Sequence, residues 1–338
     1  FLGGTMNILL TGGTGYIASH TAVVLLSLGY KVFLYDNLSN SKRQVVTQIK
    51  KITGLAVTFI KGDIRDSDRI VRLLKRKKIE AVIHFAGLKA VGHSVDRPID
   101  YFDNNVAGTV SLVRAMNLAN VKTMVFSSSA TVYGNPTYLP LDEIHPKLAV
   151  NPYGRTKLHI EELLQDVSDA DAEWNISCLR YFNPIGAHES GFIGEEPSDR
   201  PNNLMPYLVQ VALGDLPYLR VFGGDYPTPD GTGIRDYVHV MDIADGHVAA
   251  LDFLAKNGGW HALNLGTGSG CSVFELVRIF EETNQCQISA KVVERRPGDV
   301  AESYACVEKA YTKLGWRAKR TIPDMCYSAW HFRKNRVV

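Results

Sequence analysis

The sequence predicts an α/β fold in which a doubly wound parallel sheet is followed by a smaller α/β domain. Short apolar runs alternate with stretches that can form helices, which is typical of repeated βα units. The runs lack the polar alternation of half-exposed strands, so they suit strands that are buried on both faces. We expect strands at residues 7–10, 32–35, 57–61, 81–85, 122–126 and 176–180.

The composition of the chain changes at about residue 183. Loops rich in glycine, proline, aspartate and asparagine follow at 186–203 and 223–233, and they are candidate substrate-binding loops. We therefore expect a first domain at residues 1–182 and a second at 183–338. Some segments of the second domain are expected to return to the first.

Composition and charge exclude several classes of protein. Of the 338 residues, 45% are hydrophobic, which is enough for a sizeable core. The 37 basic and 35 acidic residues leave a net charge of +2, so no strong field attracts nucleic acid or an anionic membrane. The five cysteines form no CxxC pair, so we expect neither a metal site nor a disulfide framework.

The hydropathy and the N-terminus favour a cytoplasmic protein. No run approaches the roughly eighteen consecutive apolar residues of a membrane helix. A basic region followed by an apolar one, as in a signal peptide, is also missing from the start of this sequence. Residues 1–5 precede Met6 and are expected to be foreign to the native fold, because the first strand pattern begins after them.

A glycine-rich turn follows the first expected strand. It reads TGGTG at residues 11–15 and precedes a helix-compatible stretch that ends near Gly29, a candidate C-cap. Glycine lets the backbone approach a pyrophosphate, and the start of a helix offers unpaired N–H groups to that anion. The turn predicts a Rossmann-type dinucleotide site with contacts from Gly12, Gly15, Tyr16 and Ile17.

The end of the second expected strand favours NAD as the dinucleotide. Asp36 lies about twenty residues after the turn, where a carboxylate accepts hydrogen bonds from the adenosine ribose and repels the extra phosphate of NADP. Asn37 beside it is uncharged, whereas Lys42 and Arg43 leave NADP open.

Two further strand ends fit the same crevice, because the carboxyl ends of parallel strands meet at one edge of a sheet. Asp63 and Ile64 follow the third expected strand, and Asp63 could meet the adenine amino group. Residues 85–89 end the fourth strand and could pass beside the pyrophosphate and the ribose. Lys89 is as readily explained as a solvated loop lysine.

A tyrosine and a lysine are spaced to share one helix face. Tyr153 and Lys157 lie four residues apart in a helix-compatible stretch, although a tyrosine–lysine pair at this spacing also arises by chance. Ser129 and Thr131 follow the fifth expected strand and offer hydroxyls to a reacting alcohol. A nearby ammonium and a positive nicotinamide would lower the pKa of the phenol toward the working range, so Tyr153 is a candidate acid/base.

Taken together, these residues resemble the extended short-chain dehydrogenase/reductase family, and within it the enzymes that epimerise UDP-hexoses at C4. The resemblance covers essentially the whole chain from Met6. It rests on TGGTGYI at 11–17, DNL at 36–38, HFAGLKAVG at 84–92, SSSATVY at 127–133, RYFNP at 180–184, NNLMP at 202–206 and RDY at 235–237.

The resemblance implies an enzyme that keeps NAD bound, oxidises the C4 hydroxyl of UDP-galactose or UDP-glucose to a ketone, and returns the hydrogen to the opposite face. It implies that Tyr153 is the acid/base and that Lys157 orients the nicotinamide ribose and lowers the pKa of the phenol. It also implies that Ser129 and Thr131 hold the C4 oxygen. It also implies a homodimer, although apolar faces near 106–113 and 160–164 could equally be ordinary core.

The same resemblance assigns the binding residues. The cofactor contacts it implies, besides those already named, are Asn37, Asn40, Ser41, Phe85, Ala86, Gly87, Lys89, Asn104, Ser129, Tyr153, Lys157 and Phe182. The substrate contacts are Ser129, Thr131, Tyr153, Asn183, Asn203, Leu204, Val221, Phe222, Arg235, Tyr237, Arg296, Asp299 and Ser303. Two arginines in one pocket suit a diphosphate, because forked donors match its oxygens.

Two positions depart from the family pattern, and a third carries one of the two residue types that the family has there. Ala18 replaces the usual third glycine, and Pro297 stands where the family often has glutamate. Ser303 resembles a position that carries either a large tyrosine or a small residue at the sugar pocket. A serine leaves room for an N-acetyl group, which predicts that UDP-GalNAc and UDP-GlcNAc are also interconverted.

Two alternatives stay open at this point. A nucleotide-sugar 4,6-dehydratase would need an acid after the strand-end serine, and Ala130 and Thr131 occupy that place, although another loop could supply one. A regulator that binds NAD without chemistry is the other alternative, because a fold does not fix a function. The combination of Tyr153, Lys157 and Ser129 argues against it.

Overall fold

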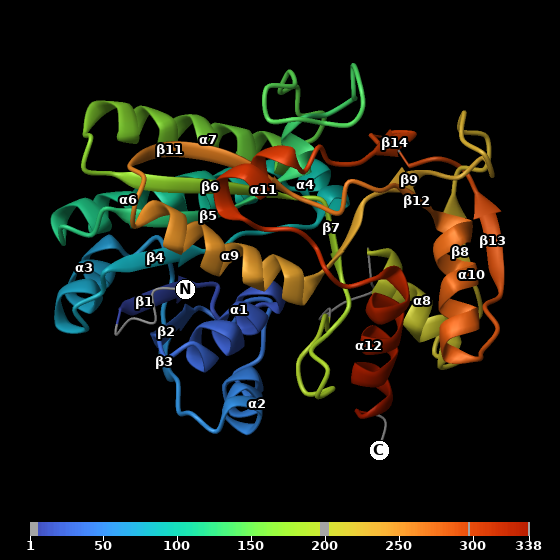
Figure 1. The fold of residues 1–338 in the computed structure, drawn as a ribbon, viewed down its shortest axis with the longest axis horizontal. Coiled ribbons are helices and arrows are strands. Elements are labelled where there is room, and N and C mark those ends of the chain that lie inside the picture. The colour runs from blue at the N-terminus through green and yellow to red at the C-terminus, as the bar shows by residue number, and fades with distance from the viewer. Residues whose placement is uncertain (1–5, 197–202, 297, 337–338) are drawn as a thin grey trace.

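The computed structural model describes residues 6–196, 203–296 and 298–336. The expected foreign segment 1–5 and Pro297 lie outside these ranges. A parallel sheet of seven strands forms the centre, in the order β11-β6-β5-β4-β1-β2-β3 (Figure 1). Its strands are β1 (Asn7–Thr11), β2 (Lys31–Asp36), β3 (Thr58–Lys61), β4 (Ala81–His84), β5 (Thr123–Ser129), β6 (Asn175–Tyr181) and β11 (Gly259–Leu265).

All six expected strands are present, and the predicted doubly wound α/β class is confirmed. The largest error in length is at β5, which continues three residues beyond the predicted end at 126. β11 was not predicted. It pairs in parallel with β6 from Gly259–Asn175 to Leu265–Tyr181, so a segment from late in the chain completes the sheet that the first half begins.

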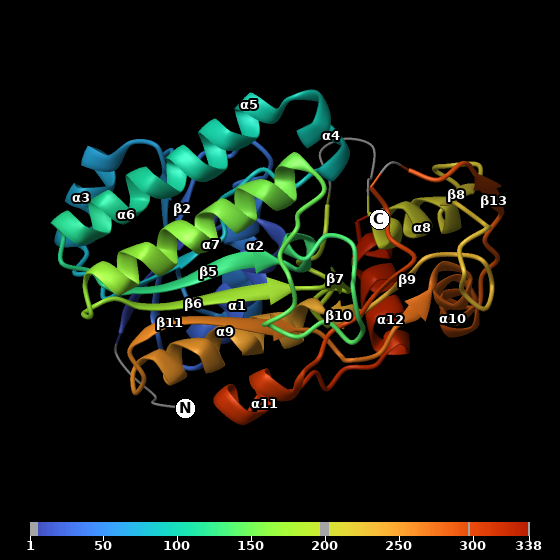
Figure 2. The ribbon, with the colours of Figure 1, turned by 90° about the horizontal axis from the view of Figure 1, so that it is seen from above.

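Helices cover both faces of the sheet. One layer packs in a single core cluster and contains α1 (Tyr16–Ser27), α2 (Gln44–Thr53), α9 (Val240–Leu254) and α11 (Glu308–Leu314). The other layer contains α3 (Ser67–Arg76), α6 (Gly108–Leu118) and α7 (Pro152–Ala170). Figures 1 and 2 show α6 and α7 on one side of the sheet and α1 and α9 on the other.

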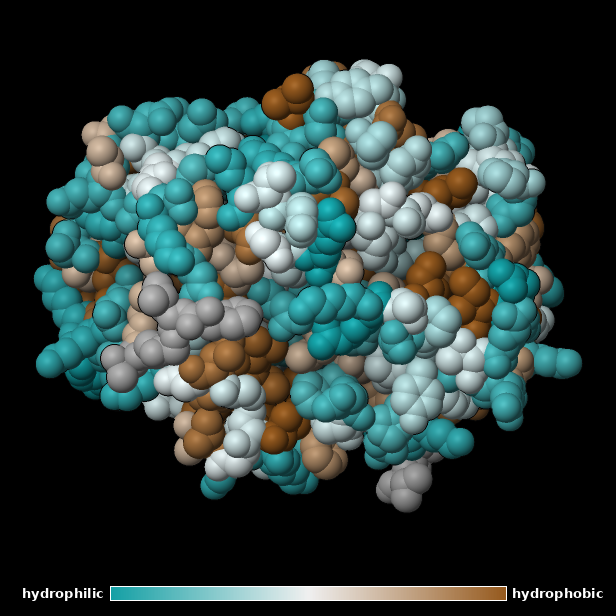
Figure 3. Space-filling model, in the orientation of Figure 1, coloured by the Kyte–Doolittle hydropathy of each residue, from teal (hydrophilic) through white to brown (hydrophobic). Residues whose placement is uncertain are grey.

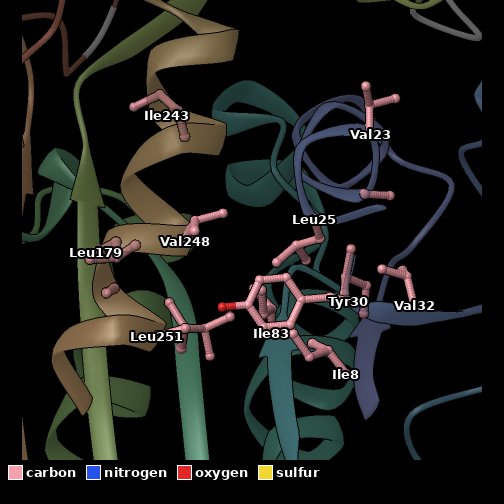
Figure 4. Close-up of a cluster of buried hydrophobic side chains, with 14 of the residues drawn as sticks. Ile8, Val23, Leu25, Tyr30, Val32, Ile83, Leu179, Ile243, Val248 and Leu251 are labelled. Carbon is pink, nitrogen blue, oxygen red and sulfur yellow. The ribbon is translucent and has the colours of Figure 1, made fainter. Parts of the chain in front are cut away.

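The core between the sheet and the first layer is apolar. Figure 4 shows Ile8 and Ile83 from the strands, Leu25 from α1, and Val248 and Leu251 from α9 in one cluster. Each of these five side chains is at most 5% exposed. Because α9 follows residue 183 in the chain, this cluster joins both halves of the sequence in one core.

A smaller lobe adjoins the carboxyl edge of the sheet and has its own core cluster. Its helices are α8 (Leu204–Ala212), α10 (Val273–Asn284) and α12 (Ile322–Lys334). Its short strands are β7 (Asn183–Ile185), β8 (Leu219–Phe222), β9 (Ile234–Arg235), β10 (Tyr237–His239), β12 (Cys271–Ser272), β13 (Ala290–Val293) and β14 (Glu302–Ser303).

Short helical segments connect β4 to the second helix layer. They are α4 (Val91–Asp96), α5 (Pro98–Tyr101) and a π-helix (Phe102–Ala107), and they lead directly into α6. A 3-10 turn (Ala130–Val132) follows β5. Within the described ranges, no helix is both long enough and apolar enough to span a bilayer. The face in Figure 3 is mainly hydrophilic, with hydrophobic side chains in scattered groups.

A buried ion pair fixes α7 to the sheet. Arg180 of β6 and Glu161 of α7 are 1% and 0% exposed, and Arg180 Nη2 lies 2.6 Å from Glu161 Oε2. Arg180 Nε donates to Glu161 Oε1 at 2.9 Å, and the Ser128 hydroxyl donates to the same oxygen at 2.6 Å. Arg180 Nη1 also reaches the Tyr133 hydroxyl at 3.0 Å. The forked donors of arginine match the two carboxylate oxygens, so this geometry orients α7.

We predict that Glu161→Ala lowers the free energy of unfolding by about 3–5 kcal/mol, because it leaves the Arg180 guanidinium buried without its partner. Urea unfolding followed by tryptophan fluorescence measures the change. Glu162→Ala is the matched control, because Glu162 is the next residue of α7 and is exposed. The control should change the free energy of unfolding by less than about 0.5 kcal/mol. Equal effects of the two substitutions would contradict the prediction.

Candidate active site

The glycine-rich turn packs directly against the loop after β4. Gly12 has a φ of +64°, and a Cβ placed there would lie 2.7 Å from the backbone nitrogen of Ala86. Only glycine fits both the backbone conformation and this close approach. Gly15 is the N-cap of α1 and provides no side-chain cap, so the first N–H groups of α1, those of Tyr16 and Ile17 among them, face the turn.

Asp36 joins the glycine-rich turn to the loop after β2. Its Oδ2 accepts from the backbone N–H of Thr14 at 3.1 Å. Its Oδ1 accepts from the backbone of Leu38 at 2.8 Å and from the hydroxyl of Ser41 at 3.1 Å. A carboxylate has about four acceptor positions, so one remains for a ribose hydroxyl. Asn40 lies in the same loop, between residues that this carboxylate orders.

Asp63 carries more partners than the sequence indicated. Its carboxylate accepts from Arg65 Nε and Nη2, both at 2.9 Å, and from Asn37 Nδ2 at 3.1 Å. The hydrogen bonds from Arg65 hold the pKa of Asp63 well below its usual range. A contact with the adenine amino group would add to these partners. Ile64, next in the chain, is 5% exposed and belongs to the core.

The loop after β4 is fixed by an asparagine that sequence reasoning missed. Asn105 Oδ1 accepts from the backbone N–H of Leu88 at 2.8 Å, and its Nδ2 donates to Leu88 O at 3.0 Å and to Thr156 Oγ1 at 3.1 Å. Asn105 lies in the π-helix beside Asn104, whose Nδ2 donates to Asn105 Oδ1 at 2.9 Å. π-helical turns frequently occur at functional sites, which is a signal that only the structure reveals.

The same loop lies next to the candidate catalytic helix. A Cβ on Gly87 would lie 3.8 Å from Lys157 Nζ. Phe85 contacts His247 of α9 with their ring centroids 4.6 Å apart. At the other end of the loop, Lys89 Nζ lies 2.9 Å from Glu195 Oε1, so it is ion-paired rather than only solvated.

The four predicted catalytic residues lie together at the end of β5 and the start of α7. Asn151 is the N-cap of α7 and accepts from the backbone N–H of Gly154 at 2.8 Å, which places Tyr153 in the first turn. Thr131 Oγ1 donates to Ser129 Oγ at 2.9 Å. Ser129 is also a hydrogen-bonding partner of the Tyr153 phenol, an interaction that only partly offsets the rise in the pKa of Tyr153 caused by its burial.

Lys157 lies one turn further along α7. Its Nζ donates to Ser127 O at 2.5 Å and lies 5.9 Å from the centroid of the Tyr153 ring. Burial lowers the pKa of Lys157 to about 8, with the Glu161 carboxylate acting in the opposite direction. Lys157 therefore loses its proton at a pH closer to neutral than an ordinary lysine does.

The expected low pKa of the phenol does not arise from the chain's own groups. Burial raises the pKa of Tyr153 to about 12 and outweighs the hydrogen bond from Ser129. The sequence interpretation considered the charge of Lys157 and left out the desolvation of Tyr153. A positive nicotinamide is the second charge expected from the sequence, and it would act to lower this raised pKa.

Strand pairing brings the predicted substrate residues together in the smaller lobe. Asn183 of β7 is in register with Tyr237 of β10, and Arg235 of β9 is in register with Ser303 of β14. The charges of Arg235 and Arg296 both act to lower the pKa of Tyr237, although its burial raises it overall. Both positive charges therefore act on the same phenol.

Arg296 connects two further predicted residues. Its Nε lies 2.9 Å from Asp299 Oδ2, and its guanidinium carbon lies 4.6 Å from the centroid of the Phe222 ring. Val221, by contrast, is 1% exposed and packs in the core of the lobe, so only its backbone could reach a ligand. Phe182 is 7% exposed and lies at the end of β6, where its backbone N–H donates to Leu265 O at 3.2 Å.

Asn203 and Leu204 lie at the start of α8. Asn203 is the N-cap residue, but its side chain makes no capping hydrogen bond. Its Nδ2 donates instead to Glu195 Oε1 at 2.7 Å. Glu195 was not among the predicted site residues, because nothing in the sequence distinguishes it from other charged loop residues.

Asp236 is a third residue that was not predicted from the sequence. It is fully buried between Arg235 and Tyr237, and it accepts from Thr267 N at 2.8 Å, Thr267 Oγ1 at 2.6 Å, Gly268 N at 3.0 Å and Ala305 N at 3.1 Å. Its burial raises the pKa of its carboxyl against these four hydrogen bonds. Its position inside the RDY stretch was the available signal. Asp236 thereby joins the segment that follows β11 to the segment that follows β14.

Metal chemistry has no support in the described part of the chain. No group of three or more histidine, cysteine, aspartate or glutamate side chains there could bind a metal ion. The five cysteines are free, and three of them are buried. These findings concern residues 6–196, 203–296 and 298–336.

The fold is that of an α/β protein with a Rossmann-type sheet, and the comparisons with known proteins narrow this class. The model of the NAD dependent epimerase/dehydratase family matches residues 8–266. The chain belongs to this family.

Full-length relatives and solved structures make the similarity more specific. A UDP-glucose 4-epimerase from Bacillus subtilis is 52% identical over 332 residues, which cover 98% of each chain. A UDP-glucose 4-epimerase from Stenotrophomonas maltophila, crystallised with NAD and formylated UDP-arabinopyranose, matches with a TM-score of 0.97 at 49% identity, over 98% of this chain and 99% of that one. A UDP-glucose 4-epimerase from Bifidobacterium longum, with NAD+ and UDP, matches at 0.95 and 47% identity, with coverage of 98% and 99%.

Proposed function

We propose that this protein epimerises UDP-galactose and UDP-glucose at C4 with NAD as its cofactor. The observation that carries the proposal is the convergence of Tyr153, Ser129, Thr131 and Lys157 at one edge of a sheet whose adjacent loops suit a dinucleotide. Relatives that match nearly the whole chain have this activity in their names.

The residues at the sheet edge fit NAD. The close approach of Gly12 to the loop after β4 brings backbone N–H groups to one place, and the start of α1 adds its positive end for a pyrophosphate. Asp36 would accept from the adenosine ribose, and its charge disfavours the phosphate of NADP. When bound, NAD would supply the acceptor for the C4 hydrogen with its electron pair and the donor for its return to the other face of the sugar.

The chain's own residues would move the proton and orient the sugar. Tyr153 would take the proton of the C4 hydroxyl and give it back, while Ser129 and Thr131 hydrogen-bond the C4 oxygen. Lys157 would bind the nicotinamide ribose and keep a positive charge near the phenol. Since burial raises the pKa of Tyr153 to about 12 even with the opposing hydrogen bond from Ser129, nearby positive charge would be what makes the phenol a usable base.

The smaller lobe would bind UDP. Arg235 and Arg296 offer forked donors to the diphosphate, and Asn203 lies at the start of α8 where further N–H groups are available. Phe222, whose ring packs beneath the Arg296 guanidinium, is the substrate residue that we place beside the uracil. An anion also offsets the repulsion between two neighbouring guanidinium groups.

The two alternatives are less well supported. A 4,6-dehydratase needs a proton donor after Ser129, and Ala130 and Thr131 form a 3-10 turn there without an acid. A regulator without chemistry would not need Tyr153, Ser129 and Lys157 to lie together at one sheet edge. A stable 4-keto-6-deoxy product would favour the dehydratase.

We predict that Tyr153→Phe reduces epimerisation by about a hundred- to ten-thousand-fold, because it removes the acid/base group. Purified protein is incubated with UDP-galactose without added NAD, and the UDP-glucose formed is quantified by chromatography. NAD released on denaturation should be equal in the variant and the wild type, which separates loss of chemistry from loss of cofactor. An unchanged rate would refute the role of Tyr153.

A second activity, the interconversion of UDP-GalNAc and UDP-GlcNAc, is proposed from one residue. Ser303 is half-buried in β14, in register with Arg235 of the proposed diphosphate site. Its small side chain leaves volume that an N-acetyl group needs.

Ser303→Tyr should abolish most turnover of UDP-GalNAc while preserving that of UDP-galactose, because the ring fills the space of the N-acetyl group. The ratio of kcat/KM for the two sugars measures this and should fall by about 10- to 200-fold. Wild-type turnover of the acetylated sugar no better than that of the variant would contradict the proposal.

A homodimer is proposed from the family resemblance. On the faces considered earlier, Ile160, Leu164 and Val113 are core residues of the single chain. Val95 and Ile99, which are 61% and 81% exposed, are the better candidates for the dimer contact. Sedimentation equilibrium should give twice the chain mass of 37.4 kDa, and a monomer mass would refute the proposal.

The domain boundary at 182/183 and a cytoplasmic location stay predictions.

A further inference from the structure

One carboxylate oxygen connects the two proposed ligand sites. Glu195 Oε1 accepts from Lys89 Nζ at 2.9 Å and from Asn203 Nδ2 at 2.7 Å. Lys89 comes from the loop after β4, on the cofactor side, and Asn203 is the N-cap of α8, on the nucleotide side. The loop after β7 that carries Glu195 therefore lies where the two sites adjoin.

We propose that Glu195 is a positioning residue that fixes Lys89 and Asn203 relative to each other, so that cofactor and UDP-sugar are bound in register. The proposal rests on the proposed function. Glu195 would not touch either ligand itself. It would act through Lys89 and Asn203, the two residues that donate to it.

Both partners need such an anchor. The Lys89 side chain is 52% exposed, and Asn203 is also exposed. An ammonium has three donors and an amide nitrogen has two, so each partner can donate to Glu195 and still donate to a ligand. A fixed donor loses less conformational entropy on binding than a free one.

The surroundings of Glu195 are unfavourable for a merely structural glutamate. Its side chain is 11% exposed, and Oε2 is buried without a hydrogen-bond partner among the described residues. Glu195 also borders a cavity between α8 and α12 whose lining includes the apolar Met205, Val209 and Phe332. A buried carboxylate with one unsatisfied oxygen destabilises a fold.

The neighbouring Glu196 shows the contrast. Its Oε1 pairs with Lys42 at 3.2 Å, and its Oε2 pairs with Arg336, so both oxygens have partners. Glu196 has the same charge, lies in the same loop and also pairs with a lysine, but among the described residues it does not hydrogen-bond to Asn203. It is therefore a matched control for Glu195.

If Glu195 acts through its charge, its substitution should tighten UDP binding, whereas if it positions Asn203, the same substitution should weaken UDP binding. A negative charge beside a site for anions opposes their binding, so its removal alone would tighten UDP. Loss of the bridge between Lys89 and Asn203 would weaken UDP binding, because Asn203 is no longer held. The sign of the change in UDP affinity thus separates the two roles.

The experiment measures UDP binding to the NAD-loaded protein by titration calorimetry for the wild type, Glu195→Ala, Glu195→Gln and Glu196→Ala. We expect the Kd of UDP to rise about tenfold in Glu195→Ala, as for the loss of one charge-assisted contact. Glu195→Gln should recover part of this, because its amide oxygen still accepts. Glu196→Ala should change the Kd less than about twofold.

Two further measurements complete the test. The thermal unfolding midpoints of both Glu195 variants should equal or exceed that of the wild type, since a buried carboxylate with one unsatisfied oxygen is removed and its partner Lys89 is half-exposed. In the epimerase assay, KM for UDP-galactose should rise with the Kd while kcat falls less than about twofold.

Unchanged or tighter UDP binding in the Glu195 variants would overturn the proposal. Weaker UDP binding that occurs only in variants with a lowered unfolding midpoint would also overturn it. The UDP titration reports on Glu195 without any turnover. A wild type that binds UDP but does not convert UDP-galactose would refute the proposed function instead, and the two failures are thereby distinguished.

Discussion

The ion pair between Arg180 and Glu161 determines where the candidate catalytic groups lie. It places two opposite charges in the interior between β6 and α7, where the cost of desolvation is met only by close, forked geometry and by further donors such as Ser128. Glu161 lies one helical turn after Lys157, and its charge partly offsets the burial that lowers the pKa of this lysine. The pair thus fixes the orientation of α7 and supports the ammonium that is proposed to act on Tyr153.

Buried carboxylates serve a similar purpose elsewhere along the edge of the sheet. Asp36 joins the glycine-rich turn to the loop after β2, and Asp236 joins the loops around the predicted diphosphate residues. Each accepts backbone N–H groups that would otherwise be unsatisfied in a loop. The loops at this edge are therefore ordered by the protein's own charges, which suits binding sites that must be formed before a ligand arrives.

The sequence was sufficient for the fold class and for six of the strands, because local apolar runs and a glycine-rich turn carry that information. It was insufficient for β11, whose pairing with β6 depends on residues more than eighty positions apart. The site shows the same division. Tyr153 and Lys157 could be found from their spacing, whereas Glu161, Asn105 and Glu195 look like ordinary polar residues until the fold brings their partners to them.

The return of β11 to the sheet has a consequence for how this chain could be divided. A fragment that ends after β6 would leave that strand as an open edge along all seven residues that pair with β11, and it would also remove α9 from the apolar face of α1. Unpaired edges of this kind recruit other chains into aggregates. The two lobes are thus distinct in the folded protein but not separable as gene fragments, and new sequence is better tolerated as an insertion in a surface loop than as a cut between them.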